Sequence, residues 1–172
     1  MALYLITGGL GYIGSHTCIE LIAAGHSVRV VDNLSNSKRA VLDRVEQISG
    51  QRPEFIQADV RDRSAMATAL PGCEAVVHFA GLKAVGESVE KPLLYYRNNV
   101  EGSIALFEAM AETGVKSIVF SSSATVYGDP ARVPIREDAA LSVTNPYGRS
   151  KLIIEGILQD VARADASVVL HS

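Results

Sequence analysis

Short runs of apolar, mostly β-branched residues recur along the chain, separated by longer stretches of mixed polarity. The apolar runs are Leu3–Thr7, Val28–Asp32, Glu54–Gln57, Ala75–Ala80, Ser117–Ser121 and Ser167–Leu170. Such runs are typical of strands buried on both faces, as in a parallel sheet. The stretches between them predict helices over Ile13–Ala24, Lys38–Ser49, Ser64–Leu70, Val89–Thr113 and Tyr147–Ala164. This alternation predicts an α/β fold, a doubly wound Rossmann parallel sheet of order 3-2-1-4-5-6 with helices on both faces.

Glycine and proline positions support these boundaries. Gly25 and Gly114 follow two of the predicted helices, where a glycine commonly ends a helix. Pro92 lies near the start of the fourth predicted helix, where proline is tolerated or introduces a kink. Turn-forming residues mark a long loop from Gly128 to Pro146, and long loops in compact domains are usually functional.

Composition narrows the class of protein. The 172 residues carry a formal net charge of −3, with 48% hydrophobic and 20% charged residues, as expected for one globular domain spanning 1–172. The mild negative charge argues against nucleic-acid binding, and no apolar run is long enough for a membrane span. Met1–Ile6 lacks the basic leader of a signal peptide. Cys18 and Cys73 suggest no disulfide framework, so we expect buried thiols and a cytoplasmic protein.

The first chemical motif follows the first predicted strand. Gly8, Gly11 and Gly14 are spaced G-x-x-G-x-x-G between that strand and a helix. Gly8 would allow a tight turn, Gly11 a close approach of the backbone to a pyrophosphate, and Gly14 close packing of helix on strand. The helix start would then offer N–H groups and a positive dipole end to phosphates. Because the strand–turn–helix context is correct, the motif predicts dinucleotide binding rather than a merely tight turn.

Two aspartates follow the next strands. Asp32 ends the second predicted strand, about 20 residues past the glycines, where a carboxylate accepts hydrogen bonds from the adenosine ribose and favours NAD over NADP. It could instead be a turn residue before Asn33. Asp59 follows the third strand and could accept a hydrogen bond from the adenine amine. An N-terminal turn residue of the next helix is an equally good interpretation of Asp59.

The third motif is Tyr147-Gly-Arg-Ser-Lys151. A spacing of four places Tyr147 and Lys151 on one helix face. A free phenol is a poor base at neutral pH, but a neighbouring ammonium and an oxidised nicotinamide both favour the phenolate. Ser123 ends the fifth strand, at the carboxyl edge where ligands bind such sheets, and its hydroxyl could bind a substrate oxygen. These three residues are therefore the predicted catalytic group. Pro146 before Tyr147 also suits a plain helix start.

Longer strings carry a family resemblance. The strings are Gly8–Thr17, Asp32–Ser37, His78–Ser88 and Ser121–Gly128. They closely resemble the UDP-glucose 4-epimerase family of the extended short-chain dehydrogenase/reductase superfamily, and the similarity runs from Leu3 to about Leu170. The resemblance implies a redox epimerisation that interconverts UDP-galactose and UDP-glucose through a 4-keto sugar, with tightly held NAD regenerated in each cycle. It also implies a homodimer paired through the fourth and fifth predicted helices, which carry Ile104, Phe107, Ile154, Ile157 and Leu158. The same helix faces could instead pack only on the sheet.

The same resemblance assigns the cofactor contacts residue by residue. The implied NAD contacts are Tyr12, Ile13, Asp32, Asn33, Leu34, Ser35, Asn36, Ser37, Asp59, Val60, Phe79, Ala80, Gly81, Leu82, Lys83, Asn98, Ser123, Tyr147 and Lys151. The sequence alone leaves two of them open. Lys83 could meet phosphate or substrate charge, or be a surface lysine, and Asn98 could hold a loop or a ribose, or be a polar residue inside a helix.

Two departures from the family pattern are visible. The segment between Tyr127 and Tyr147 is a couple of residues shorter than expected. The family continues after the sixth strand into a carboxyl-terminal substrate domain, which is missing here, so we expect weak NAD binding and impaired epimerisation from this chain alone.

Two other functions remain open at this stage. A nucleotide-sugar 4,6-dehydratase would need an acidic pair after Ser123, where this chain has Ala124 and Thr125. A non-catalytic NAD-sensing module would not need Tyr147 and Lys151.

Overall fold

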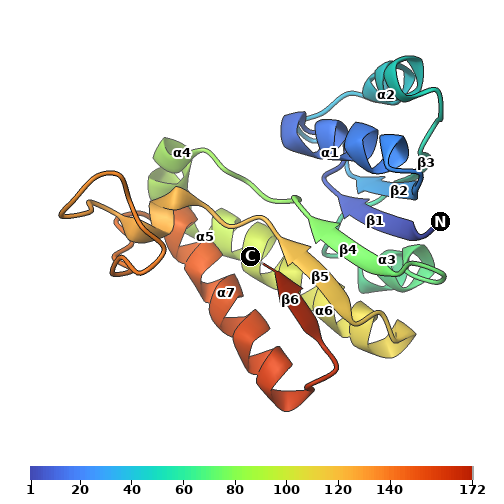
Figure 1. Ribbon diagram of the computed structural model, residues 1–172. Coiled ribbons are helices and arrows are strands. Elements are labelled where there is room, and N and C mark those ends of the chain that lie inside the picture. The colour runs from blue at the N-terminus through green and yellow to red at the C-terminus, as the bar shows by residue number, and fades with distance from the viewer. Residues whose placement is uncertain (172) are drawn as a thin grey trace.

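The computed structural model describes residues 1–171, and over this range it contains a six-stranded parallel sheet of order β3-β2-β1-β4-β5-β6 (Figure 1). The strands are β1 Leu3–Thr7, β2 Ser27–Asp32, β3 Glu54–Gln57, β4 Ala75–His78, β5 Ser117–Phe120 and β6 Val169–His171. The predicted sheet order is thus confirmed. Thr7 pairs with both Val31 and His78, and His78 pairs with Phe120. The residues that follow these strands therefore emerge along one edge of the sheet.

Nine helical segments connect the strands over residues 1–171. They are α1 Tyr12–Ala23, α2 Val41–Ser49, α3 Arg63–Ala69, α4 Val85–Glu90, α5 Pro92–Tyr95, the π-helix η1 Tyr96–Glu101, α6 Gly102–Thr113, the 3₁₀ helix η2 Ala124–Tyr127 and α7 Pro146–Ala164. None of them has the length and hydropathy needed to cross a membrane.

The helices form a layer on each side of the sheet (Figure 1). Helices α1 and α2 cover one face, where Ile6, Val30 and Leu42 belong to one buried apolar cluster. Helices α3, α6 and α7 cover the other face over a second cluster, which includes Leu106 and Ile154. Burial of apolar residues on both faces of the central strands explains why those strands are unbroken apolar runs in the sequence.

The predicted helix Val89–Thr113 is wrong as a single element. Helix α4 ends at Glu90, and Lys91 adopts φ −130° and ψ 57°, because the residue before a proline is disfavoured in the helical region. Helix α5 then begins at Pro92, and the chain passes through one π-helical segment before α6. Of the two outcomes expected at Pro92, tolerance near a helix start or a kink, the structure shows a break in the helix with Pro92 as the first residue of α5. Nothing in the apolar periodicity predicted the π-helix.

Smaller boundary differences concern the ends of other elements. The last strand covers Val169–His171 rather than Ser167–Leu170, because the Asp165 carboxylate accepts hydrogen bonds from the backbone and side chain of Ser167 in a turn. Helix α2 begins at Val41 rather than Lys38. Gly25 and Gly114 both follow a helix, as predicted, and each adopts a positive φ.

The apolar residues singled out on the last two helices mostly face the sheet. Phe107, Ile154 and Leu158 are buried in the core, and Ile157 packs against it. Ile104 remains exposed, as does Ile153 on α7.

Candidate functional site

The glycine turn lies between β1 and α1 and is sterically closed to side chains. Gly8 has a φ of +68°, which favours glycine. A Cβ on Gly14 would lie 2.5 Å from the carbonyl oxygen of Gly8 and 2.7 Å from the Cα of Gly9. Helix α1 starts after Gly11 without a side-chain cap, so its first N–H groups are directed to the space beyond the turn. The predicted strand–turn–helix geometry is confirmed.

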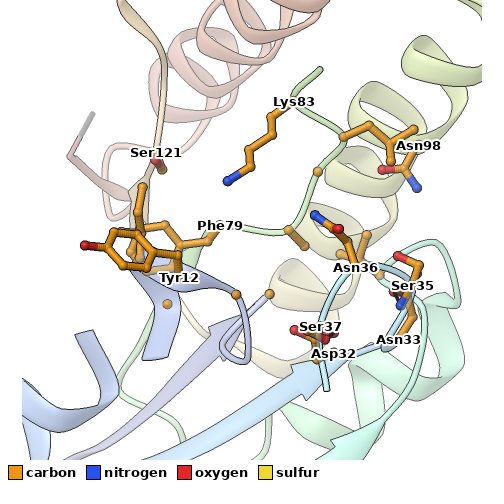
Figure 2. Close-up of a pocket in the computed structure, with 18 of the residues that line it drawn as sticks. Tyr12, Asp32, Asn33, Ser35, Asn36, Ser37, Phe79, Lys83, Asn98 and Ser121 are labelled. Carbon is orange, nitrogen blue, oxygen red and sulfur yellow. Dashed lines mark hydrogen bonds between the residues drawn. The ribbon is translucent and has the colours of Figure 1, made fainter. Parts of the chain in front are cut away.

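Asp32 lies at the end of β2 with its carboxylate nearly buried. Its Oδ1 accepts hydrogen bonds from Leu34 N at 2.9 Å and from Ser37 Oγ at 2.7 Å, and its Oδ2 accepts one from Leu10 N at 3.1 Å. Each carboxylate oxygen has two acceptor positions, so Oδ2 retains one. Figure 2 shows Asp32 and Ser37 together at the edge of the cavity, with Asn33, Ser35 and Asn36 on the same loop.

One cavity of about 850 Å³ brings most of the predicted residues together. Its lining includes Gly8, Gly11, Tyr12, Ile13, Gly14, Asp32, Asn33, Ser35, Asn36, Ser37, Val60, Phe79, Ala80, Gly81, Leu82, Lys83, Asn98, Ser123, Tyr147 and Lys151. Figure 2 shows Lys83 reaching from the loop after β4 into this space. The cavity lies at the carboxyl edge of the sheet, where doubly wound folds bind their ligands.

Two predicted residues do not line the cavity. The Leu34 side chain packs against the apolar cluster under α1 and α2. The Asp59 carboxylate pairs with Arg61 at 2.8 Å and accepts a hydrogen bond from Asn33 Nδ2 at 3.0 Å. The hydrogen bond from the Arg61 guanidinium holds the pKa of Asp59 well below its usual range. The carboxylate oxygens of Asp59 therefore face protein groups, and its predicted contact with adenine stays a prediction.

Tyr147 and Lys151 lie one turn apart near the start of α7. Asn145 caps this helix, since its Oδ1 accepts a hydrogen bond from Gly148 N at 2.8 Å. Lys151 is buried, donates to the carbonyl oxygen of Ser121 at 2.8 Å, and holds its Nζ 4.7 Å from the centre of the Phe120 ring. Burial lowers the pKa of Lys151 to about 8, so the ammonium still predominates at neutral pH.

Ser123 lies just beyond the end of β5 and lines the same cavity. Its Oγ accepts hydrogen bonds from Thr125 N at 3.2 Å and Thr125 Oγ1 at 2.9 Å. Because a hydroxyl also carries one proton to donate, Ser123 can donate to an oxygen in the cavity. The structure thus brings the three predicted catalytic residues to one cavity.

Neighbouring asparagines on η1 have different surroundings. Asn98 lines the cavity, whereas Asn99 is buried. Asn99 Oδ1 accepts from Leu82 N at 2.8 Å, and its Nδ2 donates to Leu82 O at 2.9 Å and to Ser150 Oγ at 3.0 Å. Asn99 therefore fastens the loop after β4 to α7, which is one of the roles that the sequence left open for Asn98.

A buried hydrogen-bond chain lies behind the cavity. His78 contacts Thr7 Oγ1 through Nδ1 at 2.6 Å and Ser103 Oγ through Nε2 at 3.0 Å, and Ser103 donates to Asn99 O at 2.6 Å. Since the Ser103 proton is directed to Asn99, Nε2 of His78 carries the imidazole proton and Nδ1 accepts from Thr7. Burial, assisted by the charge of Lys151, lowers the pKa of His78 to about 3. His78 is therefore neutral at physiological pH.

Sequence reasoning missed seven residues that line the cavity. They are Val31, Ala58, Ala84, Glu87, Tyr95, Ser121 and Ser122. Their position at strand ends could have revealed Val31, Ala58, Ser121 and Ser122. Tyr95 is buried, donates to Glu87 Oε2 at 3.0 Å and accepts from Ala84 N at 3.1 Å. That contact joins α5 to α4 across the break at Lys91, which no local pattern indicates.

The two thiols lie outside this site. Cys18 and Cys73 are free and buried, as predicted, and burial raises the pKa of Cys18 to about 12. No group of three or more metal-ligating side chains occurs among the described residues.

Comparisons with known proteins agree with this architecture. UDP-glucose 4-epimerase 2 of Arabidopsis thaliana is 56% identical over 167 residues, which are 94% of this chain and 48% of that protein. UDP-glucose 4-epimerase of Bacillus subtilis is 56% identical over 163 residues, which are 94% of this chain and 48% of that protein.

Solved structures are similar over nearly the whole chain. UDP-glucose-4-epimerase from Stenotrophomonas maltophila, with bound NAD and formylated UDP-arabinopyranose, has a TM-score of 0.96 and 48% identity, covering 99% of this chain and 51% of that one. UDP-glucose 4-epimerase from Bifidobacterium longum, in complex with NAD⁺ and UDP, has a TM-score of 0.95 and 49% identity. The match covers 98% of this chain and 51% of that one.

The chain spans about half the length of the curated relatives that it matches. A family model described as the NAD dependent epimerase/dehydratase family matches residues 4–170. Because this match covers nearly the whole sequence, the chain belongs to the NAD dependent epimerase/dehydratase family.

Proposed function

We propose that this chain forms the dinucleotide-binding domain, residues 1–172, of a UDP-glucose 4-epimerase that interconverts UDP-galactose and UDP-glucose. The observation that carries the proposal is a single cavity lined both by the glycine turn with Asp32 and by Tyr147, Lys151 and Ser123. Relatives that bear this name are 56% identical to the chain, and the Bifidobacterium longum structure contains NAD⁺ and UDP. A UDP-hexose is accordingly the proposed substrate.

The residues present fit NAD. Gly8, Gly11 and Gly14 line the cavity without side chains, so the backbone of the turn is open to a ligand. The uncapped start of α1 offers N–H groups to a pyrophosphate, and Oδ2 of Asp32 can accept a hydrogen bond from a ribose hydroxyl. The proposed contacts from the loops are Asn33 to Ser37, Val60, Phe79 to Lys83, and Asn98. Contacts by Leu34 and Asp59 remain predictions, since their side chains do not line the cavity.

Bound NAD would supply the hydride acceptor for C4 of the sugar. In this proposal the phenolic oxygen of Tyr147 removes the proton from the 4′-hydroxyl and returns it after the 4-keto sugar has turned over. The ammonium of Lys151, one helical turn away, provides positive charge beside that oxygen. The hydroxyl of Ser123 donates a hydrogen bond to the same sugar oxygen. Burial keeps Lys151 ordered against Ser121 and Phe120, so little reorganisation is needed when a ligand enters.

Two alternatives receive less support. A 4,6-dehydratase needs an acidic pair beyond Ser123, but η2 begins with Ala124 and Thr125, and the carboxylates that line the described cavity are Asp32 and Glu87. A non-catalytic sensor of NAD would not need Tyr147 and Lys151, and both line the cavity.

A chimera tests the epimerase proposal. Residues 1–171 are fused to the carboxyl-terminal half of the Bacillus subtilis relative, and conversion of UDP-galactose into UDP-glucose is measured. We expect turnover from the chimera and a loss of at least about 10²-fold in its Tyr147→Phe variant, because the phenol carries the transferred proton. A folded chimera that binds NAD but shows no turnover would refute the proposal, and so would equal turnover in the chimera and its Tyr147→Phe variant.

The chain by itself should be a weak binder. We expect calorimetry to give weak binding of NAD, weaker binding of NADP because of the carboxylate of Asp32, and impaired or absent epimerisation, since positioning of the sugar needs both walls of the site. Sustained conversion of UDP-galactose by the 172-residue chain would contradict this expectation.

We also propose a homodimer and a cytoplasmic location. The support for the dimer is an apolar groove of about 300 Å³ between η1, α6 and α7, lined by Tyr96, Val100, Ile104 and Ile153 among others. The support for the location is two unpaired buried cysteines among the described residues. Sedimentation of the parent and of an Ile153→Asp variant would test the first of these: a monomeric parent would refute it.

A further inference from the structure

The serine segment Ser121–Ser123 is attached to α7 by two successive contacts. Lys151 Nζ donates to the carbonyl oxygen of Ser121 at 2.8 Å. One residue further along, the hydroxyl of Ser122 donates to the carboxylate of Glu155. Because Lys151 and Glu155 are four residues apart, they lie on consecutive turns of one helix face. That face also carries Tyr147, so Tyr147, Lys151 and Glu155 form a row along α7.

Glu155 differs from the other two members of the row. Tyr147 and Lys151 line the cavity, and so does Ser122, but Glu155 does not. Its carboxylate is half-buried and accepts the hydrogen bond from Ser122. Any effect of Glu155 on a bound ligand must therefore pass through Lys151 or through the serine segment.

The charges around Lys151 come from several elements. His78 on β4 is neutral, because burial lowers its pKa to about 3. Tyr147 and Glu155 belong to the helix of Lys151 itself. Lys83, Asp32 and Glu87 line the same cavity from other segments. Desolvation lowers the pKa of Lys151 to about 8, and the charge of Glu155 opposes that decrease.

We propose that Glu155, held in place by Ser122, is a positioning residue that places a negative charge one helical turn from the Lys151 ammonium and keeps Ser123 at the cavity edge. Its relevance to catalysis rests on the proposed function, in which the Lys151 ammonium stands beside the phenol of Tyr147. The carboxylate offsets part of the desolvation of the buried ammonium. Its bond to Ser122 also fixes the backbone from which Ser123 extends.

Titration of Lys151 tests this role without any ligand. The ¹³Cε resonances of labelled lysines are followed against pH by NMR, and the Lys151 resonance is assigned with a Lys151→Arg variant. Glu155→Gln removes the charge but retains an acceptor for Ser122, and we expect it to lower the midpoint of Lys151 by about half a pH unit or more. Asp160→Asn, an exposed change on the same helix, is the matched control and should leave the midpoint unchanged.

A role confined to packing would not move this midpoint. A folded Glu155→Gln variant that titrates like the parent would overturn the proposal. If that variant does not fold, Glu155→Asp retains the charge on a shorter side chain and loses the reach to Ser122. It should shift the midpoint in the same direction by less, and an unchanged midpoint would again overturn the proposal. Turnover of UDP-galactose by the chimera, measured separately, decides the proposed function independently of this result.

Discussion

The steric closure at Gly14 leads to a prediction about a single methyl group. The Cβ of a Gly14→Ala variant would lie 2.5 Å from Gly8 O and 2.7 Å from Gly9 Cα, and both obstacles are main-chain atoms that cannot rotate away. Overpacking of this kind costs about 1–3 kcal/mol, and the higher helix propensity of alanine returns at most about 1 kcal/mol. With the full propensity gain returned, we therefore expect a net loss of about 0–2 kcal/mol in the free energy of unfolding, with the start of α1 displaced from the cavity.

Gly156 offers a matched control, at which the same substitution should change the free energy of unfolding in the opposite direction. It also lies inside a helix, α7, but a Cβ there would meet nothing within 4 Å. Gly156→Ala should therefore stabilise the chain by about 0.5–1 kcal/mol. Urea unfolding followed by far-UV circular dichroism gives both values by linear extrapolation, and NAD titration should be weakened only in the Gly14 variant. The reasoning would be refuted if both variants gained stability equally.

Two further outcomes follow from buried polar groups. Asn99→Ala should cost about 2–4 kcal/mol in urea unfolding, because it leaves both backbone groups of Leu82 without their partner, whereas the adjacent Asn98→Ala should change stability little; equal losses would contradict the assignment. The pKa of His78 is about 3 in the folded chain and about 6.5 in the unfolded chain. Between these two pH values the unfolded state therefore binds more protons than the folded state. The free energy of unfolding consequently falls as the pH drops from about 6.5 toward 3. His78→Gln should be less stable at pH 7 but lose less stability between pH 7 and pH 5 than the parent; parallel pH dependences would refute the neutral His78.

The sequence was sufficient to predict those features whose residues lie close together along the chain. The glycine motif of Gly8, Gly11 and Gly14 lies within one turn and the start of one helix, so its spacing made it predictable. The pair Tyr147 and Lys151 was predictable because both residues lie on one helix, four positions apart. The unbroken apolar runs predicted the sheet and its order for the same reason. Asp32 was predictable because it ends a recognisable strand.

The remaining features depend on contacts between distant segments. Tyr95 and Glu87 meet only because the chain breaks at Lys91. Asn99 rather than its neighbour Asn98 holds the loop after β4, since Asn99 is the one of the two that is buried on η1. The neutral state of His78 follows from its burial and from the charge of Lys151. Its ring partners, Thr7 and Ser103, come from two other elements. A short stretch of sequence contains no signal for contacts with residues that are distant along the chain.

The most direct test of a single shared site is an NMR measurement of NAD bound to the chain. Intermolecular nuclear Overhauser effects are recorded with labelled tyrosines, and Tyr147 is assigned by its Tyr147→Phe variant. We predict contacts from nicotinamide ring protons to the Tyr147 ring, together with contacts from adenosine protons to the Ser35–Ser37 loop beside Asp32. Bound NAD whose nicotinamide protons show no contact with Tyr147 would contradict the central claim.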